Sequence, residues 1–188
     1  IDLGWSDDTA IWWFQVAGKE LRFIDCYSNS GMPIAHYHDI LQSKGYDYGE
    51  WLYLPHDAKA KSLQTGRSIE EQFRSLGWSP RIVPNISLMD GIQAARLSLA
   101  NCWFDPSCKE GMEALTQYQR EYNVDKKVFN ERPKHDWTSH FADAFRYACL
   151  AWREQRPDAA PKPKAKFWED QSLEELWEHS SKRRGRRI

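Results

Sequence analysis

Three aspartates occupy positions where a carboxylate is unusual, and together they could bind metal ions. Asp2 stands among apolar residues in an expected strand, Asp57 closely follows the apolar run WLYL, and Asp143 lies on an expected helix. Strand interiors disfavour Asp, and a buried carboxylate is costly unless it binds a cation or is hydrogen-bonded. An all-oxygen ligand set suits Mg²⁺ or Mn²⁺ better than Zn²⁺. The alternative is that three scattered aspartates have no common role, which is frequent in any sequence.

The apolar pattern along the chain predicts the elements that must position these aspartates. Residues 9–16 and 21–27 are rich in β-branched and aromatic residues, and the turn signal AGK between them predicts a hairpin. Further strands are expected over residues 1–3, 51–54, 81–83 and 124–130. Helical spacing of apolar residues predicts helices over residues 34–43, 68–76, 88–99, 110–122 and 139–153.

Two of the expected helices carry strong local signals. Ser68 and Glu71 have the spacing of a capping box at the start of one helix. The last helix repeats its apolar residues at helical spacing through Phe141, Ala144, Phe145, Ala148 and Cys149. Strands followed by alternating helices and strands predict a mixed α/β sheet, antiparallel in its first three strands and parallel in later ones, with helices on its faces. If the first and fourth strands are neighbours and the last helix crosses their ends, the three aspartates converge.

Composition indicates an ordinary globular domain rather than a nucleic-acid coat. The chain has 188 residues, 41% hydrophobic and 28% charged, with a formal net charge of −1. Residues 157–188 hold eight basic and six acidic residues, net +2, which leaves the rest of the chain at net −3. An acidic body suits a carboxylate cluster that needs metal ions, and a basic end suits phosphate, although solvated charges would give the same count.

Tryptophan and cysteine are read mainly as core residues. Among the ten Trp, Trp12, Trp13 and Trp103 lie in apolar runs and are expected to pack, with one or two of the ten left to stack on bases. The four cysteines show no zinc-ligand spacing, so buried reduced thiols of a cytosolic protein are expected at Cys26, Cys102, Cys108 and Cys149. No run reaches transmembrane length, so no membrane is expected. The chain opens on Ile within a strand-like run, as a piece of a longer protein would.

Three phrases of the sequence carry a family resemblance. IDLGWSDDTAIWW, YLPHDAKAKS and above all KHDWTSHFADAFRYACLAW resemble the nuclease domain of tailed-phage large terminases, over about residues 1–152. In that family an Asp on the first strand, an acidic residue at the end of the fourth and an Asp in a final SHxADAxRY helix hold the metals. The matching positions here are Asp2, Asp57 and Asp143. The resemblance implies an RNase H-like fold, shared with resolvases and integrases, for residues 1–155.

The function implied by this resemblance is a DNA endonuclease of viral genome packaging. It would cut concatemeric double-stranded DNA with little sequence specificity, using two Mg²⁺ or Mn²⁺ ions to activate a water and to stabilise the leaving 3′ oxygen. Asp2 is the expected bridging ligand, and Asp57 and Asp143 would complete one metal each, in either order. The implied partners are double-stranded DNA, the ATPase domain of the same subunit, the portal protein and the small terminase subunit, in the host cytoplasm during virion assembly. No GxxxxGK[ST] motif is present, so ATP hydrolysis is not expected.

Residues near the three aspartates have possible accessory roles. Asp8 resembles an accessory acid of some relatives, but a turn-capping carboxylate is an equal interpretation. His140, three residues before Asp143, shares a helical face with it and would orient a water or contact phosphate, unless it is structural. Asp136 is a further accessory candidate, or it caps the last helix, as Ser139 also could. For Arg146 we favour a pair with a carboxylate over a contact with DNA.

Basic residues in two places are candidates for binding DNA phosphates. Lys59 and Lys61 follow Asp57 closely, although most lysines are only solvated. Beyond a Pro/Ala/Lys-rich stretch at residues 156–166, which is typical of a linker, the chain ends in a basic tail. Two interpretations of this tail stay open: it contacts DNA or the portal, or it is a disordered solubilising end. Its basic residues are Lys182, Arg183, Arg184, Arg186 and Arg187.

Two other functions stay open. The chain could be a different RNase H-like nuclease, such as a junction resolvase or a transposase core, although the SHFADAFRY phrase argues against it. It could also be a docking module that holds DNA or the portal and no longer cuts. Metal-dependent plasmid nicking separates the docking module from the nucleases, and a branched-junction substrate separates the resolvase.

Overall fold

A long antiparallel hairpin lies at the centre of the fold. In the computed structural model, which describes residues 1–63 and 65–155, β1 (Thr9–Ala17) pairs with β2 (Glu20–Asn29). Gly18, with φ of 62°, makes the turn that a side chain would strain. The short strand β5 (Cys102–Phe104) joins β2 in parallel, so the sheet order is β1-β2-β5. The predicted mixed sheet and its opening hairpin are confirmed.

The start of the chain lies between this sheet and a second, smaller one. Strands β3 (Leu52–Leu54) and β4 (Pro80–Ile82) pair in parallel. Asp2 and Ala10 exchange two backbone hydrogen bonds of 2.8 and 3.0 Å, and the backbone nitrogen of Ile1 donates to the carbonyl of Tyr53 at 3.0 Å. The expected strand over residues 1–3 is thus reduced to a single bridge, but that bridge connects β1 to β3.

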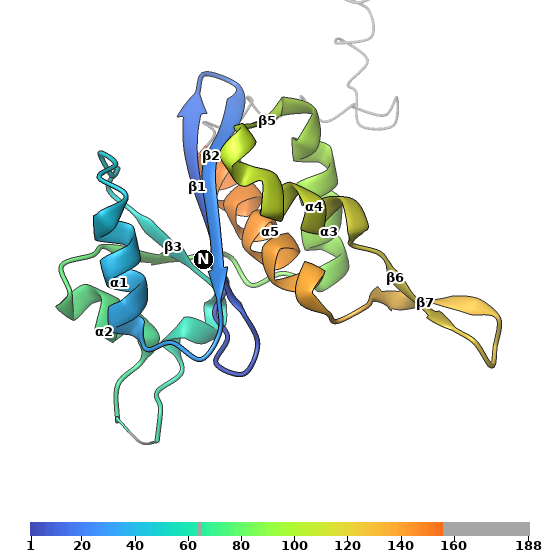
Figure 1. Cartoon of the computed structure of the whole chain (residues 1–188), viewed down its shortest axis with the longest axis horizontal. Coiled ribbons are helices and arrows are strands. Elements are labelled where there is room, and N and C mark those ends of the chain that lie inside the picture. Colours follow the sequence, from blue (N-terminus) through green and yellow to red (C-terminus); the bar gives the residue numbers. More distant parts are fainter. Residues whose placement is uncertain (64, 156–188) are drawn as a thin grey trace, which may run out of the picture. The chain divides into compact units, whose positions relative to one another are not determined.

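Helices cover both faces of the hairpin, as Figure 1 shows. On one side lie α1 (Ile34–Ser43) and α2 (Ile69–Ser75), which begins at the predicted capping box of Ser68 and Glu71. On the other side lie the three later helices, α3 (Leu88–Ser98), α4 (Lys109–Gln117) and α5 (Trp137–Gln155). Short 3-10 turns are present at His56–Lys59, Leu99–Asn101 and Pro106–Cys108. No helix in residues 1–63 and 65–155 is long and apolar enough to span a membrane.

Neighbouring tryptophans of β1 enter two different cores. Trp12 packs against α5, with its ring 5.6 Å from that of Phe141, whereas Trp13 packs with Tyr37 of α1. This follows from the strand period of two, which directs successive side chains to opposite faces. Within the core on the α5 side, a Cβ on Gly111 would overlap the Trp12 indole, so only glycine lets α4 approach β1 this closely. The hairpin is therefore the shared wall of both cores.

The last helix is the element that the sequence predicts most completely. Its expected apolar residues, Phe141, Ala144, Phe145, Ala148 and Cys149, are all buried in the core that contains Trp12. Burial of each large apolar side chain contributes about 1.5–3 kcal/mol, so this face of α5 is firmly seated. All four cysteines are free, as expected, with Cys108 and Cys149 buried and Cys26 and Cys102 half-buried.

Three predictions about local structure were wrong. The helix expected over residues 110–122 ends at Gln117, and Arg120–Asn123 instead form β6. The strand expected over 124–130 is displaced to β7 (Val128–Pro133), which pairs with β6 in a projecting hairpin (Figure 1). The sequence did not reveal this hairpin because its residues are also compatible with a helix. A cross-strand ring pair of Tyr122 and Phe129 stabilises it. Trp103 is 63% exposed rather than packed, because the three-residue β5 lies at the sheet edge.

Ile1–Gln155 form one compact unit. Residue 64 and residues 156–188 lie outside the described residues. The predicted linker and the predicted DNA-binding tail belong to that second range.

A candidate carboxylate metal site

Asp2 is held rigidly and is largely buried. Its backbone is paired with Ala10 of β1, and its side chain is 17% exposed. Burial, together with the negative charges of Asp143 and Asp57, raises the pKa of the Asp2 carboxyl to about 8. Without a cation, the Asp2 carboxyl therefore keeps its proton at neutral pH.

Asp143 reaches the same region from α5. Its side chain is 28% exposed and forms an ion pair with Arg146, one helical turn further along. The guanidinium donates to Oδ1 of Asp143 from Nε at 3.1 Å and from Nη2 at 2.9 Å. The predicted pairing of Arg146 with a carboxylate is confirmed.

Asp57 contributes the third carboxylate from the end of β3. It lies in the 3-10 turn His56–Lys59, where its carbonyl accepts from the Ala60 amide at 2.8 Å, and its side chain is exposed. Its charge contributes to the raised pKa of both Asp2 and Tyr147. The charges of Asp57 and Asp143, from two other parts of the fold, thus both act on the Asp2 carboxyl.

The residues present fit a divalent cation, although no cage is preformed. Within residues 1–63 and 65–155, no three His, Cys, Asp or Glu side chains are already arranged to hold a metal ion. The donor set is nevertheless all oxygen, and the pKa of Asp2 is raised first by burial and next by the charge of Asp143, so a bound cation would stabilise the ionised carboxylate. The role of Asp2, Asp57 and Asp143 as metal ligands stays a prediction.

Two tyrosines near the carboxylates were missed by the sequence analysis. Burial, with the charge of Asp2 as the next cause, raises the pKa of Tyr147 to about 12. Burial, with the charge of Asp143 as the next cause, also raises the pKa of Tyr118 to about 12. Tyr147 belongs to the quoted SHFADAFRY phrase, which was the available signal, whereas Tyr118 lay in a misassigned helix.

The accessory candidates differ in how closely they approach the site. His140 is 9% exposed, and its Nδ1 lies 4.0 Å from Oδ2 of Asp2. Asp136 caps α5, because its carboxylate accepts from the backbone N–H of Thr138 at 3.0 Å and from the Thr138 hydroxyl at 2.6 Å. These hydrogen bonds, first the one from the Thr138 hydroxyl, lower the pKa of Asp136. Asp8 is half-buried just before β1.

A second histidine at the start of α5 was also missed. The Nε2 of His135 lies 3.3 Å from Oδ2 of Asp7, and its Nδ1 lies 3.1 Å from the Ser139 hydroxyl. Its ring packs edge-on against His140, with centroids 5.6 Å apart. His135 thereby connects the turn before β1 to the start of α5, and its place in the quoted phrase KHDWTSHFADAFRYACLAW was the available signal.

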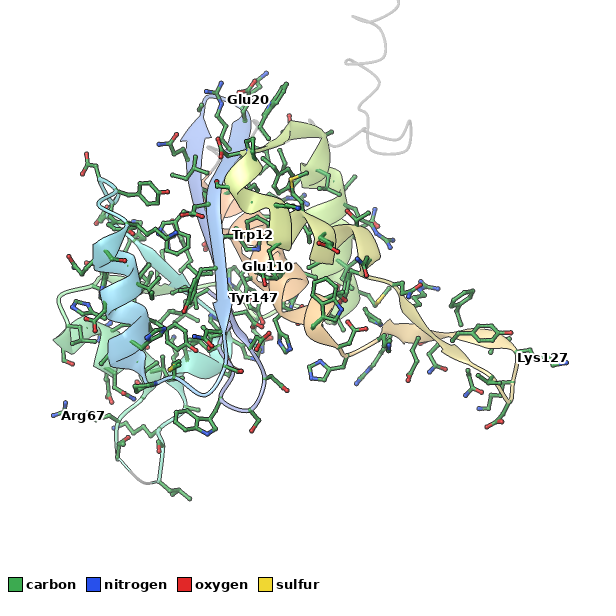
Figure 2. The ribbon with its side chains drawn as sticks, viewed as in Figure 1. Trp12, Glu20, Arg67, Glu110, Lys127 and Tyr147 are labelled. Atoms are coloured by element: carbon green, nitrogen blue, oxygen red, sulfur yellow. The ribbon has the colours of Figure 1, made fainter. Side chains whose placement is uncertain are left out.

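The basic candidates lie on the surface. Lys59 is exposed at the end of its 3-10 turn, and Lys61 is 67% exposed with Nζ 3.7 Å from Oε1 of Glu71. Figure 2 shows Arg67 in the same outer loop, and Lys127 at the tip of the β6–β7 hairpin. These positions leave the phosphate-binding role of Lys59 and Lys61 a prediction.

Solved structures share this fold at low sequence identity. The P22 large terminase nuclease domain aligns with a TM-score of 0.61 and 17% identity, over 81% of this chain and 78% of that one. The nuclease domain of the bacteriophage SPP1 large terminase, solved with bound Mn, aligns with a TM-score of 0.56 and 13% identity, over 81% and 83%. No protein-family model and no curated protein matches the sequence.

A longer solved structure matches this chain over only part of its own length. The large terminase of a thermophilic bacteriophage aligns with a TM-score of 0.61 and 16% identity, over 78% of this chain. The aligned part covers 37% of that protein. The expectation drawn from the three sequence phrases is confirmed for the fold: this chain has the fold of the large terminase nuclease domains.

Proposed function

We propose that this chain is the metal-dependent endonuclease domain of a viral large terminase, which cuts concatemeric double-stranded DNA during packaging. The observation that supports the proposal is that the charges of Asp143 on α5 and Asp57 at the end of β3 both act on the buried Asp2 carboxyl. Burial and these like charges raise the pKa of Asp2 to about 8 in a domain with the terminase nuclease fold.

The proposed metal ligands are Asp2, Asp57 and Asp143, with Mg²⁺ or Mn²⁺ as the ions. A pair of such ions would supply an activated water and stabilisation of the leaving 3′ oxygen in phosphodiester hydrolysis. Bound Mn in the SPP1 nuclease domain supports the choice of ion. Asp2 is suited to the bridging role because two backbone hydrogen bonds to Ala10 fix its position.

Other residues of the chain would assist by position and charge. His140, 4.0 Å from Asp2, would orient the Asp2 carboxylate or contact the scissile phosphate. Lys59 and Lys61 would bind phosphates of the DNA backbone near Asp57, which gives affinity without reading the base sequence. Little sequence specificity is therefore proposed for cleavage.

The proposed setting follows from the same fold. As the nuclease part of a large terminase, the chain would work in the host cytoplasm with the ATPase domain of its own subunit, the small terminase subunit and the portal protein. The described residues are proposed to perform the cleavage, whereas the motor function belongs to the ATPase domain.

Plasmid cleavage tests the proposal directly. Supercoiled plasmid is incubated with the parent chain in EDTA, Mg²⁺ or Mn²⁺, alongside Asp2→Asn and Asp143→Asn. Asp39→Asn is the matched control, because Asp39 is exposed on α1, which packs on the opposite side of β1 from α5. Metal-dependent nicking by the parent and the control, lost in both site variants, is expected.

Other results would redirect the assignment. Cleavage by Asp2→Asn and Asp143→Asn at the parental rate means that the metal site lies elsewhere. Binding of DNA without cleavage in either metal favours the docking module. Faster cleavage of a branched junction than of linear duplex favours the resolvase.

A further inference from the structure

The Asp143–Arg146 ion pair uses one carboxylate oxygen only. Both Nε and Nη2 of Arg146 donate to Oδ1 of Asp143, at 3.1 and 2.9 Å. Oδ2 accepts no hydrogen bond from Arg146. Two charge-assisted hydrogen bonds on a single oxygen make that oxygen a poor ligand for a cation. This leaves Oδ2 as the one oxygen of Asp143 that is suited to bind a metal ion.

The guanidinium that makes these bonds is itself fixed on a second side. Nη2 of Arg146 donates to the Tyr147 hydroxyl at 3.2 Å, and the guanidinium lies over the Tyr147 ring at 4.6 Å from its centre. The Arg146 side chain is 11% exposed. A buried guanidinium with three directed contacts has little freedom to swing away, so the orientation of Asp143 is set by the protein.

Helix α3 closes the third side of the guanidinium through a glycine. A Cβ added at Gly91 would lie 2.6 Å from Cδ of Arg146 and 3.1 Å from its Nη1. Glycine inside a helix is destabilising relative to alanine, so its presence at a close contact points to a packing requirement. The missing side chain of Gly91 thus leaves room for the Arg146 side chain beside α3.

We propose that Arg146 is a positioning residue that limits Asp143 to a single ligating oxygen and so favours Mg²⁺ and Mn²⁺ over Ca²⁺. This inference rests on the proposed function, because it takes Asp143 as a metal ligand. Mg²⁺ requires compact octahedral coordination, whereas Ca²⁺ takes six to eight oxygens and often binds both oxygens of a carboxylate. Mn²⁺ also suits octahedral oxygen sites. An Asp143 restricted to Oδ2 gives Ca²⁺ one oxygen fewer than it would otherwise take.

Loss of the paired Nε and Nη2 donors of Arg146, a planar fork, should therefore change the metal preference of the site more than it changes the stability of the fold. In Arg146→Gln the Asp143 carboxylate is free to rotate and to present both oxygens to the larger ion. In Arg146→Lys the charge remains, but an ammonium is a point donor and cannot repeat the planar fork. Tyr147→Phe removes only the hydroxyl that accepts from Nη2 and keeps the ring beneath the guanidinium.

Competition between Mn²⁺ and Ca²⁺ measures this preference without DNA. Free Mn²⁺ is followed by electron paramagnetic resonance during titration of each variant, first alone and then with increasing Ca²⁺. We expect the Mn²⁺ over Ca²⁺ preference to fall about 10-fold or more in Arg146→Gln and Arg146→Lys. Removal of a residue that orients a metal ligand typically changes metal affinity by about that factor or more. Tyr147→Phe should shift the preference in the same direction by a smaller factor. Arg153→Gln, which removes an exposed arginine of the same helix, should leave it unchanged.

Asp143→Asn separates failure of the inference from failure of the proposed function. Mn²⁺ binding at parental affinity in Asp143→Asn would show that Asp143 is no ligand, and both proposals would fall. Weakened binding in Asp143→Asn, with parental preference in Arg146→Lys and Tyr147→Phe, would overturn the positioning role and leave the metal site standing. Circular dichroism checks that each variant is folded. If Arg146→Gln does not fold, the Lys and Phe variants decide the matter.

Discussion

The indole Nε1 of Trp12 donates a hydrogen bond of 3.0 Å to the carbonyl of Phe141, 129 residues further along the chain. Trp12 is 6% exposed, so this bond is buried between β1 and α5. Phe141 lies two residues before Asp143 on α5. Trp12 lies two residues after Ala10, the pairing partner of Asp2, on β1. The distance between two candidate metal ligands is therefore set partly by this one contact.

Replacement of Trp12 by Phe should destabilise the domain. The variant loses the buried hydrogen bond and leaves a gap where the larger ring packed, which together cost about 1–3 kcal/mol. Urea unfolding followed by circular dichroism measures the change. Trp103→Phe serves as the control, because Trp103 is 63% exposed and should change stability by about 0.5 kcal/mol or less. Equal stability of the two variants would contradict the structural role of Trp12.

A methyl group at Gly111 should also be destabilising, against the usual trend. Alanine in a helix normally gains roughly 0.5–1 kcal/mol over glycine, but here its Cβ would overlap the Trp12 ring. We expect Gly111→Ala to lose about 1–3 kcal/mol through overpacking. The double variant Trp12→Phe/Gly111→Ala should be more stable than the sum of the single changes predicts, because the smaller ring makes room. Additive losses would mean that the two residues are not in close contact.

The stability of the metal-free domain should fall as pH rises towards 8. The pKa of Asp2 is raised from 3.8 to about 8 in the folded chain, first by burial and next by Asp143. Between these values the folded state binds more protons than the unfolded state, so the Asp2 contribution is fully present below the lower pKa and is lost through the upper one. Thermal melts in EDTA across this pH range measure the slope. Asp2→Asn should flatten it, whereas Asp39→Asn should not.

The same shift predicts proton release when metal binds. An Asp2 carboxyl with a pKa of about 8 must lose its proton before it can act as a ligand, so Mn²⁺ affinity should increase with pH up to that value. Titration of Mn²⁺ in two buffers of different ionisation enthalpy, by calorimetry, counts the protons released. Affinity that is independent of pH in this range would argue against Asp2 as a ligand.

The capping box of α2 should contribute measurably to stability. Ser68 is buried, its hydroxyl accepts from the Glu71 amide at 3.1 Å, and Glu71 accepts from the Ser68 amide at 2.9 Å. Loss of the cap in Ser68→Ala should cost about 1 kcal/mol. Ser43→Ala, at the exposed end of α1, is the control in the same unfolding experiment. A loss no larger than that of the control would show that the cap is replaceable by water.

Local signals explain which parts of this fold were predictable. The hairpin of β1 and β2, the helix at 34–43 and the last helix follow from turn residues, caps and apolar periodicity within each segment. Strand β5 has three residues and pairs with β2 about 80 positions away, and β6 is stabilised by Phe129 across a turn. The β5 pairing depends on contacts that no local window contains, whereas β6 was missed because its residues are compatible with a helix.

The candidate site divides in the same way. Asp2, Asp57 and Asp143 were selected from unusual positions and a motif, and Arg146 was expected to pair with a carboxylate, which the structure identifies as Asp143. Gly91 and the contact of His135 with Asp7 could not be found in this manner. Gly91 matters only because α3 crosses α5 at Arg146, and His135 only because the turn at Asp7 lies beside it. Both relationships exist in the folded chain alone.

Trp12 and Trp13 are adjacent in β1 but pack into different cores. This arrangement determines where the chain tolerates an insertion or a deletion. Insertion or deletion of one residue ahead of them would exchange the two rings between faces and disrupt both cores at once. Substitutions in β1 should lower the free energy of unfolding by graded amounts, whereas an insertion or deletion there should abolish folding. A label or a fused domain is better tolerated at the exposed tip of the β6–β7 hairpin, near Lys127, where added residues leave both cores in register.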